Sequence, residues 1–138
     1  MKKSIVLFLA IFCLSVACKK DETRVTKFVP SWNGGEINFD SISYAIINYS
    51  DANEIKDSLD SMNPDIFSHS VKVSNPFSIS LTDEHFYLLK KFDLFDKSDK
   101  LLYYIPYRTQ LNYSGGITLP FAFKAMNRTL VLPVTKKN

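Results

Sequence analysis

The sequence predicts a mainly β domain at residues 25–138, a β-sandwich-like antiparallel fold with one or two short helices. Three observations favour this fold. Apolar and polar residues alternate at period two in several short segments. Turn residues separate these segments at close spacing, as in sandwiches and open barrels. Aromatic residues, which favour strands, make up 14% of the chain. The alternative is an α+β fold with a helix packed on one antiparallel sheet.

The first predicted strand covers residues 25–32. Its Pro30 indicates an edge position, because proline cannot donate a hydrogen bond to a neighbouring strand. The Asn-Gly pair at 33–34 predicts a two-residue hairpin turn leading into a partner strand at 36–39. Residues 42–49 are β-branched and aromatic, and they predict a central strand.

Two segments have helical signals. Asp51 and Glu54 fit a capping box, and apolar residues follow at helical spacing up to Met62. Thr82 is placed to cap a second helix, with acidic residues in the first turn and basic residues in the last. This second helix would end near Phe95.

The other strands are predicted from alternation. Residues 67–73 form a half-buried strand with His69 on its apolar face, and residues 77–81 have the clearest period-two pattern. A further strand covers residues 101–107. Residues 117–124 and 130–134 predict a terminal hairpin whose prolines point outward.

The N-terminal segment has the composition of a secretory signal peptide. Lys2 and Lys3 precede an apolar run from Ile5 to Val16, which is shorter than the roughly 20 residues that span a bilayer. The sequence Leu14-Ser15-Val16-Ala17-Cys18 resembles the lipobox of bacterial lipoproteins, in which the cysteine is diacylated and becomes the new N-terminus. The resemblance implies a signal peptide at 1–17, lipidation of Cys18 and a tether at 18–24.

The four residues after this cysteine indicate a location. Lys19-Lys20-Asp21-Glu22 looks like the export run of Bacteroidota surface lipoproteins. It implies an outer-membrane protein, anchored by its N-terminal lipid and exposed at the cell surface. The alternative is the periplasmic face of the same membrane.

Charge and cysteine content exclude several functions. Removal of Lys2 and Lys3 leaves a net charge near +1, so the chain lacks the basic footprint of nucleic-acid binding. Cys13 would leave with the signal peptide and Cys18 would be acylated. The mature domain then has no thiol for disulfides, thiolate catalysis or cysteine metal sites.

Catalytic and metal motifs are not found. His69 and His85 lack a zinc-binding spacing such as HExxH, and no G-x-S-x-G elbow occurs. Counted from Asp51, a calcium loop would need Gly and Glu where Lys56 and Met62 stand. We expect no metal, no cofactor and no enzymatic activity.

The sequence contains more Tyr and Trp residues than a small hydrophobic core requires. Trp32, Tyr103, Tyr104 and Tyr107 are candidate ligand-facing residues, because Tyr and Trp are enriched at interfaces and sugar rings stack on such side chains. The partner would be a glycan or an envelope protein. Ordinary half-buried strand tyrosines are the alternative.

Three Asp-Ser-apolar tripeptides are similar to the O-glycosylation site of Bacteroidota proteins. They place candidate sugars on Ser41, Ser58 and Ser61. The alternative is that these Asp-Ser pairs mark turns and helix caps.

Together these features predict a lipid-anchored cell-envelope binding or accessory module. An inhibitor or immunity-type lipoprotein is the alternative, and a small envelope hydrolase is a third candidate.

Overall fold

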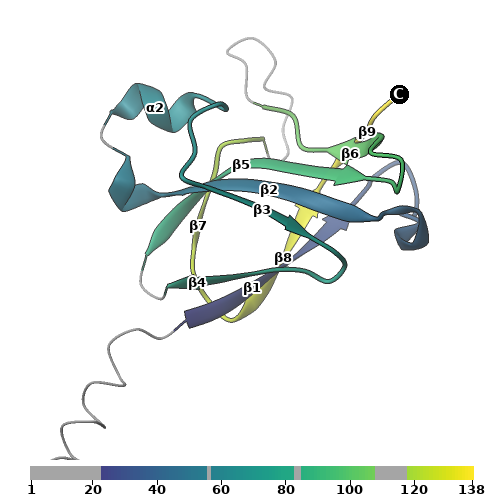
Figure 1. Ribbon diagram of the computed structural model, residues 1–138, viewed down its shortest axis with the longest axis horizontal. Helices are drawn as coiled ribbons and strands as arrows, with labels where there is room; N and C mark the ends of the chain where they lie inside the picture. The colour runs from purple at the N-terminus through teal and green to yellow at the C-terminus, as the bar shows by residue number, and fades with distance from the viewer. Residues whose placement is uncertain (1–22, 56, 83–84, 108–117) are drawn as a thin grey trace, which may run out of the picture.

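The computed structural model describes residues 23–55, 57–82, 85–107 and 118–138, which form two packed β-sheets (Figure 1). The predicted mainly β, sandwich-like class is confirmed. The strands are β1 (Thr23–Ser31), β2 (Tyr44–Asp51), β3 (His69–Val73), β4 (Phe77–Thr82), β5 (Phe86–Phe95), β6 (Leu101–Tyr104), β7 (Phe121–Lys124), β8 (Arg128–Pro133) and β9 (Thr135–Lys136). Short helices are η1 (Phe39–Ser41), η2 (Ala52–Glu54) and α2 (Ser58–Met62).

The smaller sheet has the order β4-β1-β8. β1 is antiparallel to β4 and parallel to β8. The predicted edge position of β1 is therefore wrong, and its buried Pro30 lies in a central strand. Proline is tolerated there because the pairing with β4 ends at Phe28, so on that side Pro30 has no partner strand to donate to.

The larger sheet has the order β3-β2-β5-β6-β9, and β7 pairs with the first half of β5. The strand predicted at 42–49 is confirmed as central, since β2 lies between β3 and β5. All the pairings within this sheet are antiparallel.

Aromatic rings hold the two sheets together. Phe92 of β5 is fully buried, and its ring centroid lies 5.8 Å from that of Phe28 in β1 and 6.2 Å from that of Phe77 in β4. Phe123 of β7 meets Phe28 edge-on at 5.7 Å. Such tilted and edge-on pairs add to the hydrophobic gain from burying the rings.

The helix predicted from Thr82 is wrong, because this segment is strand β5. β5 pairs with β2 through a bulge: Asn48 faces Lys91 and Tyr49 faces Leu89, so Lys90 is the extra residue. The buried apolar residues consequently occur at 87, 89, 92 and 94. The step of three across the bulge gives the sequence a partly helical spacing.

Both predicted hairpins are also wrong. Residues 36–38 form no strand. Instead the Asn38 side chain accepts a hydrogen bond from the Asp40 N–H and caps η1. At the other end of the chain, β7 belongs to the larger sheet and β8 to the smaller one, so residues 125–127 cross the sandwich.

The predicted helix after Asp51 is confirmed in part, as η2 and α2. The side chains of Asp51 and Asp57 each accept a hydrogen bond from a backbone N–H in the following turn. None of the helices in the described part of the chain is long and apolar enough to cross a membrane. The predicted signal peptide, Cys18 and the export run lie outside the described residues, and β1 already begins at Thr23, inside the predicted tether.

Candidate functional site

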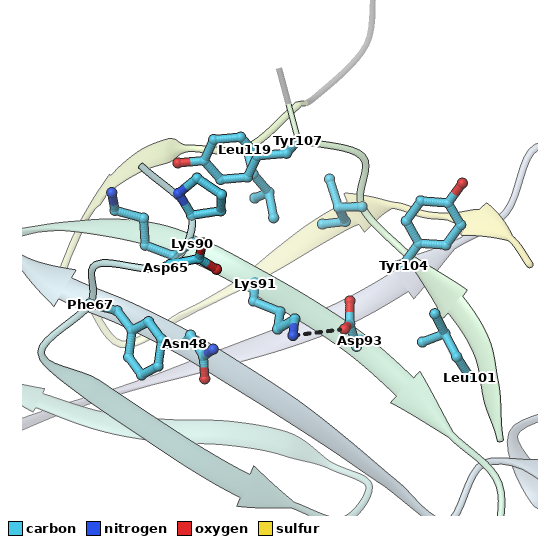
Figure 2. Close-up of a pocket in the computed structure, with 12 residues that line it drawn as sticks. Asn48, Asp65, Phe67, Lys90, Lys91, Asp93, Leu101, Tyr104, Tyr107 and Leu119 are labelled. Atoms are coloured by element: carbon cyan, nitrogen blue, oxygen red, sulfur yellow. Dashed lines mark ion pairs between the residues drawn. The ribbon is translucent and has the colours of Figure 1, made fainter. Parts of the chain in front are cut away.

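A pocket of about 280 Å³ lies on the larger sheet, between β6 and the segment that follows α2. Figure 2 shows Tyr104 and Leu101 on one side, Phe67 and Asn48 on the other, and Lys91 with Asp93 between them. Its lining residues come from distant parts of the chain: Asn48, Pro64, Asp65, Phe67, Lys90, Lys91, Asp93, Leu101, Tyr104, Ile105, Tyr107 and Leu119.

Lys90 holds one wall of the pocket in place. Because it is the bulged residue of β5, its side chain leaves the core and reaches the end of α2. Its Nζ donates to the backbone oxygens of Asp60, Ser61 and Asn63 at 2.8, 2.7 and 2.9 Å. Burial lowers the pKa of Lys90 and the Asp60 carboxylate opposes this shift.

The floor of the pocket is polar. The Lys91 Nζ lies 3.6 Å from the Asp93 Oδ2, and burial raises the pKa of Asp93 although Lys91 opposes the shift. The buried Asn48 accepts a hydrogen bond from the Ser70 hydroxyl at 2.6 Å. These groups offer both donors and acceptors to a polar ligand.

Two of the four predicted ligand-facing aromatics, Tyr104 and Tyr107, line this pocket. The Tyr107 hydroxyl is buried and has no hydrogen-bond partner among the described residues, and burial raises its pKa. A buried hydroxyl without a partner carries a desolvation cost, and Figure 2 shows this one pointing away from Tyr104.

The other two aromatics lie elsewhere. Tyr103 is 7% exposed and belongs to the core, where its ring meets Trp32 edge-on at 5.9 Å. The Lys136 Nζ lies 5.0 Å from the Trp32 ring centroid. Because neighbouring strand residues face opposite sides, Tyr103 lies in the core and Tyr104 lines the pocket.

Sequence reasoning missed Lys90, Asn48 and Asp93 as pocket residues. Asp93 and Lys91 alternate with buried apolar residues, which places them on the outer face of a strand, but the charges at the two ends of this segment favour a helix. No signal in the sequence marks Lys90 as a bulge.

A second polar cluster gathers where β2 ends and β5 begins. The His85 Nδ1 lies 2.9 Å from the Asp51 Oδ2, and the same Asp51 side chain accepts the Asn53 N–H at 2.9 Å. Burial acts to raise the pKa of Asp51, but the hydrogen bonds with His85 and Asn53, together with the charges of His85 and His69, outweigh it and lower the pKa. His85 directly precedes strand β5, since the helix predicted from Thr82 does not form.

His69 lies near this cluster. The sequence pattern places His69 on the apolar face of its strand, but its side chain is 45% exposed. The ring stacks on Tyr49 at 5.0 Å, and its Nε2 lies 4.0 Å from the Glu54 Oε1. Within the described residues no group of three or more His, Cys, Asp and Glu side chains is arranged to bind a metal ion.

We expect the substitution His85→Ala to make the protein more sensitive to acid. The lowered folded-state pKa of Asp51 means that its contribution to stability is complete above the unfolded value of about 3.9 and is lost as the pH falls through the folded value. Without His85 the folded value rises, so the acid unfolding midpoint, followed by circular dichroism, moves to higher pH. His69→Ala is the matched control and should shift this midpoint less. Superimposable acid-unfolding curves for wild type and His85→Ala would show that His85 does not lower the pKa of Asp51.

The three predicted glycosylation sites differ in their surroundings. Ser41 is exposed, and its hydroxyl donates to the Asn38 backbone oxygen at 2.7 Å. Ser61 is half-buried, and its backbone oxygen binds Lys90. The side chain of Ser58 lies outside the described residues.

No protein-family model, no curated protein and no solved structure matches this chain.

Proposed function

We propose that this chain is a lipid-anchored binding module of the bacterial cell envelope and that the pocket beside β6 binds a glycan. The N-terminal sequence supports the anchor, because a basic start, a short apolar run and Cys18 in a lipobox-like context are typical of lipoproteins. Two acyl chains suffice for stable attachment to a membrane. The domain is thereby held at the membrane surface, facing the outside of the cell.

The Tyr104 ring beside the Asp93 carboxylate, its partner across the β5–β6 ladder, is the observation that carries the binding site. An aromatic ring next to donors and acceptors suits a sugar, which has an apolar face and a rim of hydroxyls. The volume of about 280 Å³ is close to the lower limit of roughly 300 Å³ for ligand pockets. It therefore suits one sugar unit, such as the end of a chain, and leaves the rest of the glycan in solvent.

We expect Tyr104→Ala to weaken glycan binding about thirtyfold, because truncating a central aromatic contact costs about 2 kcal/mol. The measurement is retention on an oligosaccharide array, followed by calorimetry with the best-retained sugar. Tyr44→Ala is the matched control, since Tyr44 belongs to the same sheet but stacks on Phe95 outside the pocket. A protein that retains no sugar, or a Tyr104→Ala variant that binds as well as wild type, would refute the proposed site.

The anchor is tested separately. Metabolic labelling with an alkyne fatty acid is expected to mark the wild-type chain and not Cys18→Ala. Protease shaving of whole cells then reports whether the domain is at the surface.

A further inference from the structure

One end of the sandwich exposes an apolar group of side chains close to the start of β1. Val25, Phe86 and Met126 are 49%, 56% and 47% exposed. Basic side chains accompany them, because Lys124 is paired with Phe86 in the β5–β7 ladder and exposed Arg128 follows the same turn. We refer to Val25, Phe86, Lys124, Met126 and Arg128 as the basal rim.

Hydrogen bonds connect the ends of four strands, β1, β5, β7 and β8, at this place. The Val25 N–H donates to the Asn127 side chain at 2.8 Å, and the Thr26 hydroxyl donates to the Met126 backbone oxygen at 3.0 Å. The Ala125 N–H donates to the His85 oxygen at 3.2 Å, which brings the start of β5 to the same turn. Figure 1 shows the start of β1, the start of β5 and the turn between β7 and β8 at one end of the molecule.

The length of the chain before β1 decides what lies against this end. Five residue steps separate Cys18 from Thr23, which span at most about 18 Å even when fully extended. If Cys18 carries the lipid, the membrane surface is within this reach of Thr23, and Val25 is only two residues further on.

We infer that the basal rim rests on the lipid surface that receives the acyl anchor. This inference rests on the proposed lipidation of Cys18. Val25, Phe86 and Met126 enter the interfacial region, where partly buried apolar side chains and aromatic rings are favourable. Lys124 and Arg128 face the phosphate groups. The domain is thereby oriented as well as attached.

The orientation has a direct effect on the binding pocket. β6, which carries Tyr104, lies at the far side of the molecule from the start of β1 (Figure 1). Docking through the basal rim consequently keeps the pocket open to solvent and to large glycans.

Site-specific quenching tests this contact on the full lipidated chain. Phe86→Cys and Met126→Cys are each labelled with a thiol-reactive fluorophore, and Ser98→Cys is the matched control. Ser98 is exposed and lies in the turn after Phe95, the end of β5 that is about 30 Å from Phe86 at the rise of a strand. The labelled proteins are reconstituted into phosphatidylcholine–phosphatidylglycerol vesicles with and without brominated acyl chains.

We expect brominated lipid to reduce the fluorescence at positions 86 and 126 and to leave position 98 unchanged. Equal quenching at all three positions, or quenching at 98 alone, would overturn the inference. Vesicles that carry the protein in flotation but quench none of the labels would overturn it too, while leaving the anchor intact. A protein that does not float with vesicles refutes the proposed lipid attachment itself.

Discussion

The substitution Lys90→Met is expected to destabilise the domain by about 2–4 kcal/mol. Lys90 is 1% exposed, and its ammonium group is the donor for three backbone oxygens at the end of α2. Hydrogen bonds to charged groups contribute about 1.5–3 kcal/mol each, but methionine also avoids the cost of burying a charge, so the net loss is smaller than the sum. Denaturation in urea, followed by circular dichroism, measures the change in the free energy of unfolding.

Lys91→Met is the control for this prediction. Lys91 is the next residue, its side chain is 51% exposed, and it forms an ion pair with Asp93, whose side chain is 13% exposed. A pair with one exposed member contributes more than a pair of two exposed ions, which gives about 0–1 kcal/mol, but less than three hydrogen bonds from a buried ammonium group. A five-residue helix is not stable by itself, so the Lys90→Met variant should also lose hydrogen-exchange protection in α2. Equal losses of stability for the two variants would show that Lys90 does not hold the helix.

The substitution Phe92→Ala is expected to cost about 3–5 kcal/mol, which is a large share of the 5–15 kcal/mol typical of a domain. The Phe92 ring is fully buried and meets Phe28 and Phe77 from the opposite sheet. Its removal leaves a cavity between the sheets that rigid strands cannot close.

Phe86→Ala in the same strand is the matched control. The Phe86 side chain is 56% exposed, so its truncation in detergent should change the free energy of unfolding by no more than about 0.5 kcal/mol. A Phe92→Ala variant that unfolds at the same urea concentration as Phe86→Ala would show that the sheets are not held together at this ring.

The sequence predicts strands well where one face of a strand is regular. β4 is an example: Phe77, Ile79 and Leu81 are all buried, and the residues between them are not. Along β5 the same logic fails because the bulge at Lys90 shifts the buried positions by one residue. A bulge is a property of the pairing with β2, and neither strand reveals it alone.

Local sequence patterns also do not reveal which strands pair with one another. Residues 121–124 and 128–133 alternate as expected and are adjacent in the sequence, yet they join different sheets. For the pocket, alternation correctly separates Tyr103 from Tyr104, because neighbouring strand residues face opposite sides. It does not bring Asp65 and Asn48 to the same place, since that depends on where α2 ends.

The pairing of β1 with β8 has a consequence for how the chain folds during its synthesis. These strands lie about a hundred residues apart, as the hydrogen bond between Val25 and Asn127 illustrates. The smaller sheet cannot assemble until almost the whole polypeptide has emerged, and contacts of such long sequence separation form slowly. If the N-terminal segment directs export, as we propose, a precursor built in this way can pass through a translocation channel before its smaller sheet closes.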